Sequence, residues 1–295
     1  VPQSGGGWSW GQLSNINTFL KDCSRCNDEA ARKEFEAVAR FFRAYFYYDK
    51  VKHFGEVPWF DEPLSSTNDR LYAPRTPRNE LINNILADLD FAAENLPTAK
   101  NLYRVTKWTA LALKSRVCLY EGTWRKYHGF EGHETYLKAA AEAAEMFIDN
   151  SPYTIYNAGE QPYRDLFAAD KAKAEEVILA RNYNSALSIV HSANLYFLSG
   201  GASPGMNKKV VNSYLMKDGT RFTDLPNYNS MQYYDEMQNR DPRLAQTIVT
   251  PGYKRIGEST VTSVNFGATT TGYQIIKWVS TTASDGYNKS QNDIP

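Results

Sequence analysis

The sequence has no excess of charge and no long apolar run. Among its 295 residues, Lys and Arg total 33 and Asp and Glu total 33, so the formal net charge is zero. This balance argues against a nucleic-acid-binding protein, which needs a basic surface to neutralise phosphates. The apolar runs are much shorter than the ~20 residues that a membrane-spanning helix needs. The sequence therefore predicts no transmembrane helix.

Cysteine and histidine are also scarce, with three and four residues. Cys23 and Cys26 have CxxC spacing, but no second pair and no nearby histidine completes a zinc site. They are interpreted as a short-loop disulfide or as two free thiols. Cys118 lies in an apolar helical pattern and is interpreted as a core residue. Since the histidines show no HxxxH or HExxH spacing, we predict no metal site and no cofactor.

Known catalytic motifs are missing as well. The sequence contains no GxSxG, GxxxxGK[ST] or GxGxxG. A carboxylate pair for glycoside hydrolysis is harder to recognise, because its two members meet only in the folded chain. Adjacent acidic residues, which are typical of solvated faces and helix ends, occur at Asp61–Glu62, Glu175–Glu176 and Asp235–Glu236. The sequence favours binding without reaction, and a glycan-degrading enzyme stays open as an alternative.

The strongest positive signal is the segment 34–58, EFEAVARFFRAYFYYDKVKHFGEVP. On a helix its apolar residues cover one broad arc, which predicts an inner helix covered on two sides. A narrow polar stripe remains, formed by Glu36, Arg40, Arg43, Tyr47 and Lys50. The pattern thus predicts that Phe42, in the middle of the arc, is buried and that Arg43 faces solvent.

Similar apolar periodicity predicts further helices over 8–20, 76–96, 105–122 and 133–150. After residue 152 the pattern changes to irregular segments with short helices over 207–216 and 231–238. Short strands are predicted over 176–181, 245–250 and 273–279. We therefore predict a mainly α fold, with a helical layer over 1–152 and a loop-rich, ligand-presenting region over 153–295, in one integrated domain.

Several motifs occur in an order that resembles a known family. They include ARFFRAYFYYDKVKHFGEVPW (39–59), RVTKWTALALKSRVCLYEG (104–122), YLKAAAEAAEMFIDNSPYTI (136–155), YRDLFAADKAKAEEVILAR (163–181), VNSYLMKDG (211–219) and NRDPRLAQTIVTPG (239–252). In this order they resemble the SusD/RagB family, the surface glycan-binding lipoproteins of Bacteroidetes. Tyr103 stands where that family usually has glycine.

The resemblance implies a fold of tetratricopeptide-like helical pairs and a non-enzymatic function. It implies that the protein captures oligosaccharides on the outer-membrane surface and delivers them to a SusC-like TonB-dependent transporter. It further implies a lipid anchor upstream of this chain and C-terminal helices after residue 295, so the chain is expected to be truncated at both ends. Those helices would cover the apolar arc over 35–51. A protein-binding helical scaffold is a further alternative.

The candidate binding residues are chosen on chemistry, because ligand residues vary within the family. Sugars present apolar C–H faces and hydroxyl groups, so their sites combine exposed aromatic rings with amides or carboxylates. Two loop stretches offer this combination: Asn182, Tyr183, Asn184, His191 and Tyr196 in the first, and Asn227, Tyr228 and Tyr233 in the second. We predict that they build one sugar platform, and that its binding depends only slightly on salt.

Overall fold

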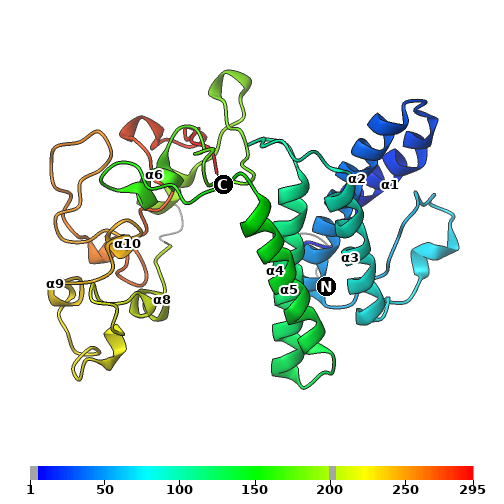
Figure 1. The fold of residues 1–295 in the computed structure, drawn as a ribbon. Coiled ribbons are helices and arrows are strands. Elements are labelled where there is room, and N and C mark those ends of the chain that lie inside the picture. The colour runs from blue at the N-terminus through cyan, green and yellow to red at the C-terminus, as the bar shows by residue number, and fades with distance from the viewer. Residues whose placement is uncertain (1–5, 199–203, 295) are drawn as a thin grey trace. The chain divides into compact units, whose positions relative to one another are not determined.

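A computed structural model describes residues 6–198 and 204–294 of the protein (Figure 1). The chain divides into two compact units, Val1–Pro152 and Tyr153–Pro295. The first unit is built from long helices, and the second joins short helices by loops. The fold is therefore mainly α, as the sequence predicts.

Successive helices pack side by side in the first unit (Figure 1). Its α-helices in the described part of the chain are α1 (Gly11–Asp22), α2 (Glu29–Phe54), α3 (Arg78–Asn95), α4 (Lys107–His128) and α5 (His133–Asn150). Shorter 3-10 turns are η1 (Cys23–Arg25) and η2 (Asp69–Tyr72). The boundaries follow local chemistry, since the Asp28 carboxylate accepts a hydrogen bond from the Ala31 amide at 3.0 Å and caps α2.

Helices α4 and α5 approach each other closely at Gly122. A Cβ atom there would lie 2.8 Å from the Leu137 side chain and 3.1 Å from the His133 carbonyl oxygen on α5. Ser115 Oγ, on α4, donates to the Ala140 carbonyl oxygen at 2.9 Å. Small residues on α4 therefore set the spacing of this pair.

The apolar arc of α2 is buried on only one of its two sides. The side that faces the core consists of Ala37, Phe41, Ala44, Tyr48 and Val51. On the other side Phe35, Phe42 and Tyr45 are 53%, 43% and 56% exposed. The prediction that Phe42 is buried within this chain is therefore wrong.

The polar stripe of α2 is buried instead of solvated, which corrects the second expectation for this helix. Arg43 donates to Asp88 on α3 through Nε and Nη2 at 2.6 and 2.7 Å, and both side chains are buried. Tyr47 is fully buried, and its hydroxyl accepts a hydrogen bond from the Phe60 amide at 2.6 Å. Lys50 is buried as well. Polar groups with matched partners can line a helix interface, so residue type alone does not identify the wet face.

The second unit contains only short elements in its described part. Its α-helices are α6 (Pro162–Ala168), α7 (Ala193–Leu198), α8 (Lys208–Ser213), α9 (Tyr233–Glu236) and α10 (Pro242–Ala245). Its 3-10 turns are η3 (Ser185–Leu187), η4 (Phe222–Asp224), η5 (Phe266–Ala268) and η6 (Thr282–Ser284). A small core of Val211, Leu244, Ile248 and Tyr273 holds α8 and α10 together.

The short strands predicted for this unit are present only as isolated bridges. Arg181 pairs with Ile294, Gly205 with Gln274, and Ile248 with Ile275. Side-chain bonds to the backbone replace a ladder: the buried Asp293 carboxylate accepts from the amides of Ala172 and Tyr183, each at 3.1 Å. These segments contain residues that favour strands, but among the described residues they have no neighbouring strands with which to form a sheet.

Three further properties of the described residues bear on function. None of their helices is both long and apolar enough to cross a membrane. They contain no group of three or more His, Cys, Asp or Glu side chains that could hold a metal ion. Cys23, Cys26 and Cys118 are free thiols, and burial raises the pKa of Cys118 to about 11.

Candidate functional site

Most polar groups of the first predicted stretch have structural partners. The Tyr183 ring is buried and meets His191 edge-on, with 4.5 Å between ring centroids. His191 Nε2 lies 3.0 Å from the Asn292 carbonyl oxygen, while Nδ1 accepts from the Ala193 amide at 3.2 Å. Both bonds fit a neutral imidazole with its proton on Nε2, and burial lowers the pKa of His191. These two rings hold the loop in place.

The remaining residues of this stretch differ in what they can offer to a ligand. Asn184 Oδ1 caps η3 by accepting from the Ala186 amide at 2.9 Å. Asn182 Oδ1 accepts from Lys171 Nζ at 2.9 Å. The Tyr196 ring is 44% exposed and is therefore the accessible aromatic group of the first stretch.

Tyr233, in the second stretch, belongs to the core of its unit. Its hydroxyl donates to the Val249 carbonyl oxygen at 2.5 Å, and its ring packs against Tyr273 and Phe266. Burial raises the pKa of Tyr233 to about 12. The structure thus gives Tyr233 a packing role.

Figure 1 shows the two predicted stretches at different ends of the second unit, with η3 far from the segment around α9. The structure therefore does not bring them into one platform. Within the second stretch, Asn227 is exposed and Tyr228 lines a pocket. That pocket has a volume of ≈ 550 Å³, which lies within the range usual for small-ligand sites.

The pocket beside Tyr228 is lined by seven residues. Its lining side chains are polar or aromatic except for one leucine. They are Lys209, Asn212, Ser213, Leu215, Arg221, Thr223 and Tyr228. A ring beside amide, hydroxyl and cationic groups is the combination that the chemistry of sugars requires.

The local sequence explains how these side chains come together. Helix α8 places Lys209, Asn212 and Ser213 on one face, because residues three and four apart are helical neighbours. A tight hairpin then pairs Leu215 with Arg221. Its turn uses Gly219 at a φ of +88°, a conformation that glycine adopts without steric cost.

Buried contacts hold together the elements that carry the lining residues of the pocket. The Arg240 guanidinium donates to the carbonyl oxygens of Val211 and Tyr214 at 2.8 and 3.1 Å, at the end of α8. The same group lies 3.8 Å from the centroid of the buried Phe222 ring in η4. Helix α8 and η4 are thereby held against each other, which positions the lining residues that they carry.

A turn presents Tyr228 to the pocket. The Tyr228 amide donates to the Leu225 carbonyl oxygen at 3.2 Å, with Pro226 at the second turn position, where its fixed φ is favourable. The Tyr228 ring meets Phe222 edge-on at 6.0 Å between centroids. Tyr228 is therefore held on a buried ring while it lines the pocket.

Sequence reasoning found Tyr228 but missed Lys209, Asn212, Arg221 and Thr223. Two signals could have found them. The spacing within 208–213 predicts a polar face on a short helix. The Asp-Gly dipeptide at 218–219 predicts a hairpin that brings residue 221 back towards that helix.

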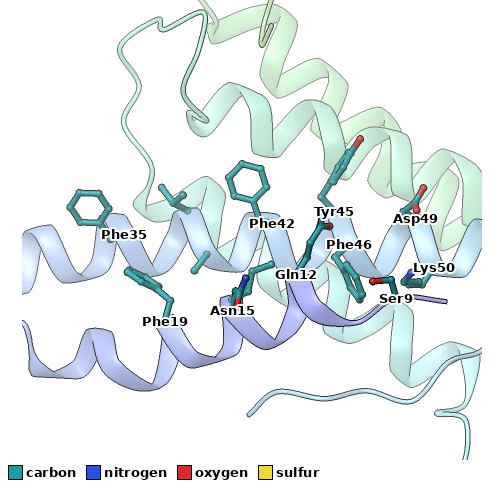
Figure 2. Close-up of a pocket in the computed structure, with 13 residues that line it drawn as sticks. Ser9, Gln12, Asn15, Phe19, Phe35, Phe42, Tyr45, Phe46, Asp49 and Lys50 are labelled. Atoms are coloured by element: carbon teal, nitrogen blue, oxygen red, sulfur yellow. The ribbon is translucent and has the colours of Figure 1, made fainter. Parts of the chain in front are cut away.

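A larger groove, ≈ 800 Å³ in volume, follows α1 and α2 in the first unit (Figure 2). Phe19 from α1 and Phe35, Phe42 and Tyr45 from α2 line it. These exposed rings are the uncovered side of the α2 arc. Most of the residues that line the groove are apolar or aromatic, and its polar lining residues are Ser9, Gln12, Asn15, Asp49 and Lys50. The groove therefore suits an apolar surface better than a sugar.

A further pocket lies between α3 and α4 around Trp124. The Arg78 guanidinium lies 3.7 Å from the centroid of the Trp124 ring. Arg78 and Arg125 both donate to the fully buried Glu121 carboxylate, each with a contact of 2.7 Å. Since its charged groups bond mainly to one another, this cluster acts as a structural link between helices.

Comparison with known proteins agrees with the architecture. Residues 166–295 match the family described as the SusD family, and residues 9–119 match the one described as "Starch-binding associating with outer membrane". A SusD-like protein P2 of Formosa agariphila is 30% identical over 179 residues, which are 60% of this chain and 33% of that protein. A SusD-like protein of Bacteroides ovatus is 26% identical over 170 residues, 58% of this chain and 30% of that protein.

Solved structures show the same fold at low sequence identity. A SusD-like protein from Bacteroides fragilis has a TM-score of 0.71 at 19% identity, covering 93% of this chain and 58% of its own. A structure solved with a xylogluco-oligosaccharide has a TM-score of 0.66 at 19% identity. The match covers 97% of this chain and 55% of that chain. The chain thus spans about a third of the curated relatives and rather more than half of these structures.

Two features define the class of protein: a layer of paired helices and a loop-rich unit with short helices. Both are shared with the solved SusD-like structures, and family matches fall in both units. The chain belongs to the SusD-like family.

Proposed function

We propose that this protein is a non-enzymatic glycan-binding protein, which captures oligosaccharides and delivers them to a SusC-like TonB-dependent transporter. It acts at the surface of the outer membrane, held by a lipid anchor upstream of this chain. Membership of the SusD-like family supports the proposal. So does the relative whose structure was solved with a xylogluco-oligosaccharide.

One observation within the chain carries the proposal: the aromatic and polar pocket around Tyr228. A Tyr ring offers an apolar face to the C–H side of a sugar, and the amide and hydroxyl groups of Asn212 and Thr223 match its hydroxyls. Asn227, exposed next to Tyr228, lies at the rim of the same turn. Tyr196 remains a separate candidate from the first stretch.

A glycan panel with product analysis tests this function. We expect at least one oligosaccharide to bind the purified protein and to be recovered unchanged after long incubation. Sustained release of reducing sugar, abolished by substitution of one Asp or Glu, would instead support the glycan-degrading alternative. A protein that binds none of the glycans would contradict the proposal.

The apolar groove on α1 and α2 is the observation that favours the protein-binding alternative. A protein scaffold would use such exposed rings for contact. This alternative predicts that the protein associates with a peptide or protein and binds none of the glycans, and that Phe35→Ser and Phe42→Ser weaken that association. Association that survives both substitutions would argue against this face as the contact.

A further inference from the structure

We infer that the pocket around Tyr228 selects an acidic sugar, one that carries a carboxylate or a sulfate ester. The inference rests on the proposed function and names the class of glycan that the site takes. It is drawn from the charges that line the pocket, together with its ring and its amide group.

Two cations line the pocket, Lys209 from α8 and Arg221 from the hairpin strand that follows. Neither side chain forms a salt bridge with a carboxylate in the described part of the chain. Both are exposed, so their charges are hydrated and available to a ligand. Other arginines near the core of this unit already have hydrogen-bond partners. Arg240 donates to backbone carbonyl oxygens, and Arg255 donates to the Asp285 carboxylate.

No carboxylate is among the residues that line this pocket. The acidic residues nearest in sequence are Asp218 and Asp224. Asp218 accepts hydrogen bonds from the amide and hydroxyl of Thr220 at 3.0 and 2.7 Å, which lower its pKa. The lining is therefore positive although the chain as a whole is neutral, and a positive concave surface favours an anionic ligand.

The other lining groups favour a sugar over a simple inorganic anion. Tyr228 supplies a ring, which an inorganic anion does not need. The Asn212 side-chain oxygen is buried and has no hydrogen-bond partner among the described residues. Rotation of that side chain towards a hydroxyl group in the pocket would break no bond to its oxygen. Ring, amide and paired cations together fit a sugar with one negative charge.

Matched oligosaccharides separate charge from sugar shape. The probes are oligogalacturonides and their methyl esters, which share a backbone but differ in charge, and a sulfated oligosaccharide with its desulfated form. We expect one acidic probe to bind and its neutral partner to bind at least about tenfold more weakly, since charge-assisted bonds to Lys and Arg are lost. Affinity for the acidic probe should fall as NaCl rises from 50 to 500 mM.

Variants locate the effect. Lys209→Gln and Arg221→Gln should each weaken acidic binding by about tenfold, because each removes one charged donor. The matched control is Lys208→Gln, an equal charge change one residue away on α8 and outside the pocket lining. It should leave affinity within about twofold, and melting curves should show all three variants folded.

Each outcome has a distinct meaning. Preference for the carboxylate or for the sulfate pair supports the inference and identifies the anion. Equal binding of charged and neutral partners would overturn the inference and leave the proposed function intact. An equal loss of affinity for the acidic probe in Lys208→Gln and Lys209→Gln would also overturn the inference, because the effect would then come from the general surface charge. Failure of these probes and of the whole glycan panel would overturn both proposals.

Discussion

Arg43 and Asp88 form a buried ion pair that joins α2 to α3. Both nitrogen–oxygen contacts, 2.6 and 2.7 Å, are short, and the guanidinium approaches the carboxylate with two donors. The Arg43 guanidinium also lies 5.2 Å from the centroid of the Trp59 ring. Removal of either ion would leave the other charged and buried, which is more costly than the pair is favourable.

Arg43→Ala should therefore destabilise the protein by about 3–5 kcal/mol, as loss of one partner of a buried ion pair does. Phe42→Ala should cost less, about 1 kcal/mol, because the Phe42 ring is 43% exposed. Urea denaturation midpoints of the two variants provide the measurement. A larger loss for Phe42 than for Arg43 would show that the arc, and not the stripe, faces the core.

Buried tyrosines give the protein a predictable response to alkali. The pKa of Tyr233 is raised from 10.0 to about 12 by burial, so the folded state holds this proton more tightly than the unfolded state. Its contribution to stability is complete below pH 10 and is lost as the pH rises towards 12. Burial also raises the pKa of Tyr47 and Tyr273.

The urea concentration at the unfolding midpoint should therefore decrease as the pH is raised from 9 to 11. Tyr233→Phe removes one of the groups responsible, so its midpoint should fall less steeply over that range. At pH 7 this variant should be about 1 kcal/mol less stable, because the bond to the Val249 carbonyl is lost. An equally steep fall in both proteins would mean that Tyr233 ionises freely in the folded state.

At the scale of elements, the contact between α4 and α5 depends on the absence of a side chain at Gly122. A methyl group there would meet Leu137 and the His133 carbonyl oxygen at distances shorter than normal contact. Alanine usually favours a helix over glycine by about 1 kcal/mol, so steric strain and helix propensity act in opposite directions at this position.

We expect strain to prevail, so that Gly122→Ala destabilises the protein by about 1–3 kcal/mol. Gly11→Ala is the matched control, because Gly11 also lies in a helix and has no atom within 4 Å of an added Cβ. It should be neutral or slightly stabilising. Thermal melting of the two variants tests the difference, and a stabilised Gly122→Ala would show that α4 and α5 can separate at no cost.

The elements of the first unit could be predicted because their periodicity is local. The pattern over 133–150 matches α5, and Asp28 and Gly55 mark the ends of α2. The orientation of α2 could not be predicted, because the partner of Arg43 lies 45 residues away on another helix. A stripe of partnered polar residues and a solvated stripe have the same sequence pattern.

The second unit was less predictable for a related reason. Its backbone bonds join distant residues, as when the Arg181 amide donates to the Ile294 carbonyl oxygen, and no local pattern encodes such a pairing. Within the candidate site, the turn that carries Tyr228 could be read from Leu225 and Pro226. The cations opposite it could not, since they come from a helix and a hairpin that meet only in the fold.

For the molecule as a whole, a net charge of zero predicts weak long-range attraction of any ligand. The local lining of the Tyr228 pocket changes the expectation for salt dependence, because binding responds to the nearest charges within a Debye length of about 10 Å at 0.1 M salt. A neutral protein can therefore bind an acidic sugar at one positive pocket.

The central claim is that the second unit binds glycan at Tyr228, and calorimetric titration of three variants tests it most directly. The ligand is the oligosaccharide that binds most strongly in the panel. Tyr228→Ala should weaken binding by about 1–3 kcal/mol, the usual effect of losing a central ring. Tyr234→Ala, which removes an exposed ring outside the pocket lining, should leave affinity unchanged, and Tyr196→Ala tests the first stretch. Unchanged affinity in Tyr228→Ala, with the protein still folded by its melting curve, would contradict the account.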